Sequence, residues 1–212
     1  MVTTFFSPHH AAPIEGMSLR NCYDHATLTF YWIPKEGDSD MTNDGRTVTL
    51  DGPKTKDLMG TDGKSIAKVA EITYDKFQME GTGLLENGIL VNLGGSKDKF
   101  QKVDRTSDPF GIGSNENPLT PWVSVASNDL KRGTLLYVKE LDGVQLPYGQ
   151  VHNGCVRVDD EGWSFGKCQI DFFTLQFSAY KDLDNKIPEK VTCMYKSLIF
   201  VIVNYLSITF YK

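Results

Sequence analysis

Residues 122–176 read WVSVASNDLKRGTLLYVKELDGVQLPYGQVHNGCVRVDDEGWSFGKCQIDFFTLQ and decide the fold. Four runs in this stretch are rich in apolar, β-branched and aromatic residues, and Gly-bearing turns separate them: 122–126, 134–139, 155–159 and 170–176. Alternation with a period of two residues is typical of half-buried strands. Strands spaced so regularly predict a β-barrel or a β-sandwich.

The sequence before this stretch extends the β pattern. Residues 26–33 (ATLTFYWI) predict a first strand, residues 46–50 a second, and residues 77–93 two short strands around the turn Glu86-Asn87-Gly88. Residues 65–74 fit either a short helix or a strand. We expect no long amphipathic helix.

Residues 100–121 contain three prolines and two glycines and predict a long loop. Long loops in compact domains often carry functional residues.

The composition places the chain among soluble globular proteins. It has 212 residues, 40% of them hydrophobic and 23% charged, with a net charge of −5. This length fits one domain of roughly 200 residues, or a domain of ~100 residues with a large insertion. A negative net charge argues against a nucleic-acid partner, because phosphates attract basic surfaces.

Two carboxylates near the end of the deciding stretch are candidate catalytic groups. Asp160 opens a turn and Asp171 heads an apolar strand, so a hairpin-like return would bring both to one rim. Two acids in one cleft have pKa values that move apart, so that one stays protonated and donates a proton. General acid/base cleavage of a glycosidic bond needs this pair. By spacing alone, two surface carboxylates remain the alternative.

The run Asp160-Glu161-Gly162 … Phe165 … Ile170-Asp171 resembles the signature of the 3D domain, which is named for its aspartates. This domain is a double-psi β-barrel of MltA-type lytic transglycosylases and of resuscitation-factor-like cell-wall proteins. Other pieces are similar to the family in the same order. They are Thr29-Phe30-Tyr31, more loosely residues 79–84, and Gly133-Thr134 before the strand 135–138.

The resemblance implies a mostly β fold: a six-stranded double-psi β-barrel from residues 22–35 and 121–180, with residues 36–120 as an inserted β-rich lobe. It also implies a cell-wall glycan-cleaving enzyme, in which Asp171 acts as acid and then as base on a β-1,4-glycosidic bond. Asp160 would be the companion aspartate.

The chain departs from the family pattern at one aspartate. The family carries it in the strand before Gly-Thr, where this chain has Ala126. Asp129 is the nearest substitute. This departure leaves a second hypothesis open, a non-catalytic, expansin-like protein that binds polysaccharide or loosens the wall.

Four residues are candidates for substrate binding: Thr29, Tyr31, Asp129 and Trp163. Trp163 either stacks on a sugar ring or packs in the core.

The four cysteines include no CxxC pair, which argues against a zinc ribbon. Cys155 and Cys168 flank the expected hairpin, so a disulfide between them is one hypothesis, and small buried thiols are the other. The run His152-Asn153-Gly154-Cys155 is similar to the motif around the nucleophile of L,D-transpeptidases, but Asn153 is inserted. A structural or disulfide role for Cys155 is therefore favoured over a nucleophilic one.

The ends of the chain bear on location. No signal peptide is visible at the N-terminus. The run 198–211 is almost wholly apolar, yet short of the ~20 residues of a membrane-spanning helix. Three interpretations of this run remain open: one or two buried strands, a membrane-associated tail, or a tail that is not part of the fold. We expect an extracellular or cell-envelope monomer that binds peptidoglycan, chitin or a related β-linked glycan. We expect no cofactor, metal, nucleic acid or lipid bilayer among its partners.

Overall fold

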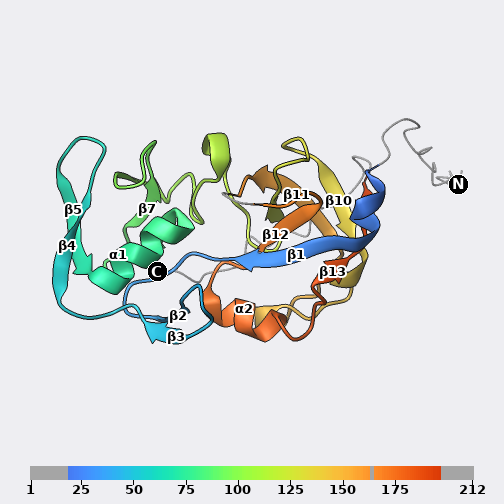
Figure 1. The fold of residues 1–212 in the computed structure, drawn as a ribbon, viewed down its shortest axis with the longest axis horizontal. Coiled ribbons are helices and arrows are strands. Elements are labelled where there is room, and N and C mark those ends of the chain that lie inside the picture. Colours follow the sequence, from blue (N-terminus) through green and yellow to red (C-terminus); the bar gives the residue numbers. More distant parts are fainter. Residues whose placement is uncertain (1–18, 163–164, 197–212) are drawn as a thin grey trace, which may run out of the picture.

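The computed structural model describes residues 19–162 and 165–196. Trp163 and the apolar run 198–211 lie outside the described residues. The fold is mostly β with two α-helices (Figure 1). None of the helices in the described ranges has the length and apolar character that crossing a membrane requires.

A seven-stranded sheet forms the larger part of the molecule. Its strand order is β13-β1-β12-β9-β11-β10-β14. β1 pairs in parallel with β12, and β9 with β11, while the other neighbours are antiparallel. The strands are β1 (Ala26–Tyr31), β9 (Ser124–Ala126), β10 (Leu135–Val138), β11 (Cys155–Asp160), β12 (Gln169–Phe173), β13 (Lys190–Val191) and β14 (Cys193–Tyr195). The expected strands at 26–33, 122–126, 134–139, 155–159 and 170–176 are all present.

The two edges of this sheet meet. β13 and β14 lie at opposite ends of the strand order, yet only Thr192 separates them in the sequence. The backbone N–H of Lys139, directly after β10, donates a hydrogen bond of 3.1 Å to the Thr192 carbonyl. The sheet therefore curls until its first and last strands are neighbours along the chain.

Residues between β1 and β9 form a second lobe of small β elements and one helix (Figure 1). β2 and β3 form one hairpin, β4 and β5 another, and β6, β7 and β8 a three-stranded sheet. The elements are β2 (Ser39–Met41), β3 (Thr47–Thr49), β4 (Lys54–Met59), β5 (Ser65–Ala70), α1 (Glu71–Glu80), β6 (Thr82–Leu84), β7 (Leu90–Leu93) and β8 (Phe100–Lys102).

Both alternatives for residues 65–74 hold in part, because β5 ends at Ala70 and α1 begins at Glu71. The expectation that strand begins at Phe77 is wrong. Helix α1 continues to Glu80 and ends at Gly81, whose φ of 73° is a left-handed conformation that glycine adopts without a Cβ penalty. The hairpin around Glu86-Asn87-Gly88 follows, formed by β6 and β7.

A second helix, α2 (Phe177–Leu183), follows β12 and buries Phe177, Ala179 and Leu183. The remaining helical turns are 3₁₀: η1 (Asn21–His25), η2 (Ser114–Glu116), η3 (Lys139–Leu141) and η4 (Pro147–Gly149).

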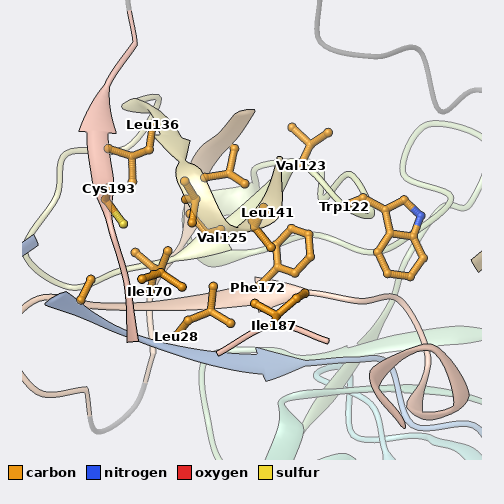
Figure 2. Packing of buried hydrophobic residues seen from close by; sticks show 14 of the residues in the cluster. Leu28, Trp122, Val123, Val125, Leu136, Leu141, Ile170, Phe172, Ile187 and Cys193 are labelled. Carbon is orange, nitrogen blue, oxygen red and sulfur yellow. The ribbon is translucent and has the colours of Figure 1, made fainter. Parts of the chain in front are cut away.

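Three hydrophobic clusters hold the molecule together. The largest lies within the curled sheet and includes Phe172, Val125 and Trp122 (Figure 2). Another fills the second lobe around Phe77 and Phe100. The third spans the boundary, since it joins Leu84 and Leu90 of the lobe to Ile33, Leu119, Phe173 and Leu175. This third cluster fixes the second lobe against one end of the sheet.

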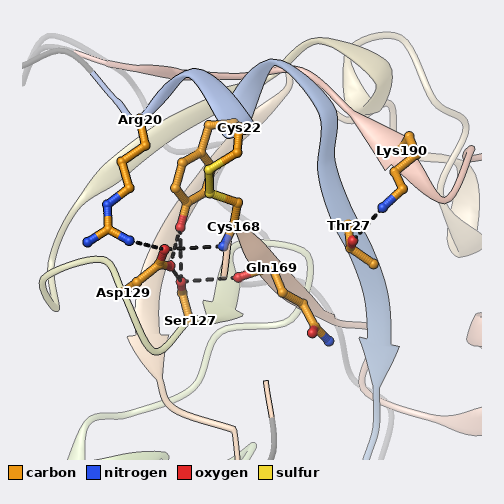
Figure 3. The surroundings of a disulfide bond; sticks show 9 residues. Arg20, Cys22, Thr27, Ser127, Asp129, Cys168, Gln169 and Lys190 are labelled. Atoms are coloured by element: carbon orange, nitrogen blue, oxygen red, sulfur yellow. Dashed lines mark hydrogen bonds and ion pairs between the residues drawn. A yellow bond between two sulfur atoms is a disulfide. The ribbon is translucent and has the colours of Figure 1, made fainter. Parts of the chain in front are cut away.

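A disulfide joins Cys22 to Cys168 (Figure 3). The hypothesis of a disulfide between Cys155 and Cys168 is wrong, and Cys155 and Cys193 are free thiols. The reason lies in the sheet order: β9 lies between β11 and β12, so these two strands do not form a hairpin. Cys22 belongs to η1 and reaches the residue that precedes β12.

Candidate active site

A cleft of about 730 Å³ lies between the curled sheet and the second lobe. Its sheet wall contains Tyr31, Ala126, Asp160, Asp171 and Phe173. Its lobe wall comes from the end of α1, from β6–β8 and from the loop 112–119, and includes Glu80, Thr82, Asn92, Lys97, Gln101 and Ser114. The expected loop 100–121 begins with strand β8, and its later part, residues 112–119, contributes to the cleft.

Asp171 lies on β12 and its carboxyl group faces the cleft. Its Oδ1 atom is buried and has no hydrogen-bond partner among the described residues. Burial raises the pKa of Asp171 to about 7; a hydrogen bond from Thr29 opposes this shift, and the negative charges of Glu80 and Asp160 add to it. A carboxylic acid with this pKa holds its proton near neutral pH and is suited to general acid catalysis.

Thr29 is positioned for its contact with Asp171 by strand pairing. It lies on β1 directly beside Asp171 in the parallel register. Its hydroxyl also accepts a hydrogen bond of 3.2 Å from the Gln169 side chain. Thr29, which we expected to bind substrate, therefore contacts the Asp171 carboxyl and is not among the residues that line the cleft.

Asp160 ends β11 and anchors the cleft loop. Its Oδ1 accepts hydrogen bonds from the Ser114 backbone N–H (2.7 Å), the Ser114 hydroxyl (2.8 Å) and the Glu161 N–H (2.8 Å). Burial raises its pKa, and the bonds from Ser114 partly offset that rise. Asp160 thus has three donors where Asp171 has an unpartnered oxygen, so the two carboxyls have different environments in one cleft.

A close backbone approach brings the loop to Asp160. A Cβ atom on Gly113 would lie 2.9 Å from the Asp159 carbonyl oxygen and 2.9 Å from Cγ of Asp160. Only glycine fits this contact without displacing neighbouring atoms. The glycines of the long loop are the sequence signal for this arrangement.

Tyr31 contributes a second unpartnered polar group. Its hydroxyl is buried and has no hydrogen-bond partner within the described ranges. Burial and the charges of Asp160, Asp171 and Asp159 raise its pKa well above the usual value, so it remains a donor. The ring packs on Phe173 with a centroid distance of 5.0 Å. Tyr31 thus lines the same cleft as Asp171 and brings to it a hydroxyl that has no partner in the described part of the chain.

Glu80 is a functional candidate that the sequence reasoning missed. It ends α1 and lines the cleft from the lobe. Its Oε1 accepts a 2.7 Å hydrogen bond from Lys76, one helical turn earlier. The i,i+4 spacing is visible in the sequence, but it has a structural meaning only because α1 continues to Glu80, whereas we expected a strand from Phe77.

Asp129 does not line the cleft. Its carboxylate contacts the Tyr23 hydroxyl, the Cys168 backbone N–H (3.1 Å), Ser127 and Arg20 around the disulfide (Figure 3). Burial raises the pKa of Asp129, but these contacts outweigh it and leave the pKa below its ordinary value. The expectation that Asp129 replaces the missing family aspartate is therefore wrong, because these bonds hold it beside Cys168.

Cys155 lacks the partner that a nucleophile needs. His152 is buried, and its Nε2 is 2.7 Å from the Trp122 carbonyl while its Nδ1 accepts the Gly154 N–H at 2.8 Å. Both ring nitrogens therefore bond to backbone. Burial raises the pKa of the Cys155 thiol, which disfavours the reactive thiolate.

No group of three or more His, Cys, Asp or Glu residues with metal-binding geometry occurs in residues 19–162 and 165–196.

No protein-family model matches the sequence, and no curated protein matches it. Solved structures resemble the fold. E. coli MltA with bound chitohexaose aligns with a TM-score of 0.52 at 13% identity, over 82% of this chain and 71% of that one. A membrane-bound lytic murein transglycosylase from Agrobacterium tumefaciens gives 0.49 at 11% identity, over 80% and 72%. The chain therefore has an MltA-like fold, and the low identity limits this likeness to the fold.

Proposed function

We propose that this protein cleaves glycan strands, with Asp171 as the single catalytic acid and base. The observation that carries the proposal is the Asp171 carboxyl itself. It is buried in a sugar-sized cleft, one of its oxygens has no partner among the described residues, and its pKa is about 7.

The reaction proceeds without water. Protonated Asp171 donates its proton to the glycosidic oxygen as the bond from that oxygen to C1 breaks. The resulting carboxylate then accepts the proton of the C6 hydroxyl, whose oxygen bonds to C1 and closes a 1,6-anhydro ring. The negative charge of Asp160 favours the oxocarbenium-like transition state. The unpartnered Tyr31 hydroxyl is placed to donate a hydrogen bond to the sugar.

The substrate we propose is a β-1,4-linked glycan that contains N-acetylglucosamine, either peptidoglycan or chitin. The fold likeness to a protein crystallised with chitohexaose supports this choice. The disulfide supports an oxidising compartment, hence an extracellular or cell-envelope location.

We further propose that the curled sheet is a double-psi β-barrel of the 3D type, with residues 36–120 as an inserted lobe. The parallel pairs β1–β12 and β9–β11 and the meeting of the sheet edges at Thr192 support this assignment. The expected six strands within residues 22–35 and 121–180 do not match the sheet: five of its seven strands lie there, and β13 and β14 lie beyond residue 180.

A second candidate function is expansin-like: binding a wall polysaccharide without cleaving it. Ala126 favours this alternative. It occupies the β9 position where the resemblance places an aspartate, and it lies between Asp160 and Asp171.

One experiment separates the two functions. The purified protein is incubated with peptidoglycan and with chitin, and the products are analysed by mass spectrometry beside Asp171→Asn and the control Asp142→Asn, an exposed residue outside the cleft. Anhydro-sugar ends that disappear only in Asp171→Asn support the lytic reaction. Ordinary reducing ends indicate hydrolysis. Binding without any product overturns the enzyme proposal in favour of the second candidate.

A further inference from the structure

We propose that Glu80 is an electrostatic positioning residue of this site: its carboxylate, held at the cleft by Lys76, faces the site from the second lobe and opposes the development of negative charge on Asp171. This inference deepens the proposed function, because it concerns the protonation of the same catalytic group.

The Glu80 carboxylate is held in place by a buried cation. The Lys76 side chain is 6% exposed and lies 2.7 Å from Glu80 Oε1. Lys76 also donates to the Met41 carbonyl at 2.9 Å and lies 3.2 Å from Asp40 Oδ1. Its ammonium group sits 4.8 Å from the centre of the Trp32 ring. The ammonium group therefore has a fixed position, and so does the carboxylate that it contacts.

The partners of Lys76 are fixed in turn. Asp40 is 1% exposed and accepts hydrogen bonds from the Trp32 indole N–H (3.1 Å to Oδ2) and from the Met41 N–H (2.7 Å). Trp32 follows β1 directly and stacks on Tyr180 of α2 at 4.8 Å. The network thus ties helix α1 of the lobe to the end of the strand that carries Thr29 and Tyr31.

Glu80 remains open to the cleft on its other side. Its side chain is 20% exposed and lines the same cleft as Asp171. Burial raises the pKa of Glu80 above its ordinary value, Lys76 offsets part of this rise, and Asp40 adds to it. Only the charged form of Glu80, which the contact with Lys76 supports, acts on Asp171.

The charged and titratable groups that act on Asp171 come from both walls. Glu80 belongs to α1, Asp160 to β11 and Tyr31 to β1, while β9 presents only Ala126. The charge of Glu80 raises the pKa of Asp171 more than the charge of Asp160 does.

The test measures the protonation of Asp171 directly and needs no enzymatic activity. The side-chain carboxyl carbons are labelled with ¹³C and followed by NMR from pH 4 to 9, and Asp171→Asn identifies the Asp171 signal. We expect Glu80→Gln to lower the Asp171 titration midpoint by roughly 0.5 to 1 pH unit. Asp40 and the Met41 carbonyl still pair with Lys76 in this variant, so the protein is expected to fold.

Two further variants control the result. Glu116→Gln removes another carboxylate that lines the cleft but does not act on Asp171, so it should leave the midpoint unchanged. Glu80→Asp keeps the charge and should keep the midpoint within about 0.3 pH unit of the wild type. An unchanged midpoint in folded Glu80→Gln, or an equal fall in Glu116→Gln, overturns the inference.

The outcome is distinguishable from failure of the proposed function. If the protein cleaves glycans, the alkaline limb of its pH profile should move to lower pH in Glu80→Gln by the same amount as the NMR midpoint. If the protein cleaves none, the NMR midpoints still decide whether Glu80 acts on Asp171.

Discussion

Asp160 and Asp171 flank a single residue, Ala126, with which both lie in register. Asp160 on β11 pairs with Ala126 in the parallel direction, and Asp171 on β12 pairs with it in the antiparallel direction. The bulge of β11 between Val158 and Asp160 brings Asp160 to this level. The two carboxyls are therefore placed by β9, a strand that itself contributes no charged group between them.

This relationship predicts the effect of restoring an aspartate. Ala126 is 3% exposed, so Ala126→Asp buries a third carboxyl between two others. We expect a loss of roughly 2 to 4 kcal/mol in the free energy of unfolding at pH 8, and a smaller loss at pH 4, where Asp171 is protonated and repels the new carboxyl less. Urea unfolding at the two pH values measures the difference. An equal loss at both would mean that steric crowding, not charge, limits the position.

The pKa of Asp171 predicts a pH dependence of stability. Its value of about 7 in the folded protein lies above the ordinary 3.8. Between these values the folded protein binds a proton that the unfolded chain has released, so this contribution to stability is complete below pH 4 and is lost as the pH rises towards 7. Asp171→Asn should therefore be more stable than the wild type by roughly 2 to 4 kcal/mol at pH 8 and equal to it near pH 4.

Thermal unfolding of the two proteins across this range is the measurement. Asp142→Asn, at an exposed position, should track the wild type throughout. A constant difference between Asp171→Asn and the wild type at all pH values would contradict the raised pKa.

The charge of the cleft predicts which sugars it accepts. Its lining contains Glu80, Glu116, Asp160, Glu161 and Asp171 but only one basic residue, Lys97. A cleft with this excess of acidic side chains has a negative potential and repels anions. In calorimetric titrations at low salt, N-acetylglucosamine or glucosamine hexamers should bind at least tenfold more tightly than a galacturonic acid hexamer. Equal affinity for the acidic hexamer would mean that the carboxylates are protonated or screened.

The disulfide predicts a large and specific loss of stability. Cys22 and Cys168 are 146 residues apart, so their bond closes a long loop in the unfolded chain. We expect Cys22→Ala to lower the free energy of unfolding by roughly 3 to 5 kcal/mol. The matched control is Cys155→Ala, which removes a free thiol and should cost less than about 1 kcal/mol. Similar losses in both variants would show that packing, not the cross-link, stabilises the protein at Cys22.

The strands were predictable because their patterns are local. Residues 26–31 (ATLTFY) and 169–173 (QIDFF) both combine alternating polar and apolar residues with aromatic ones. Both segments are strands. Helix α1 was missed because its residues, Glu71–Glu80, carry few apolar side chains at helical spacing and include β-branched and aromatic ones. Tertiary contacts, such as those of Phe77 and Lys76, stabilise it instead.

The order of strands was not predictable from local pattern. Residues 155–160 and 169–173 follow one another and read as a hairpin, yet β9 inserts between them. The same insertion has two effects on the residues that the sequence analysis singled out. It places Asp160 and Asp171 in one cleft, and it separates Cys155 from Cys168 and leaves Cys168 to Cys22. Pairing of distant segments depends on the whole sheet, which no short window of sequence contains.

The position of β1 has a consequence for how the chain acquires its structure during synthesis. Thr29 contacts Gln169 and Thr27 contacts Lys190, at separations of 140 and 163 residues. A ribosome adding about 5 to 20 residues per second would expose β1 for many seconds before either neighbour emerges. By then the ribosome has synthesised all residues of the second lobe. The sheet cannot form completely until its last strands, β13 and β14, have been synthesised. Termination of translation after residue 121 and before residue 169 would therefore release a chain whose aromatic β1 has neither of its partner strands, a substrate for chaperones or proteases.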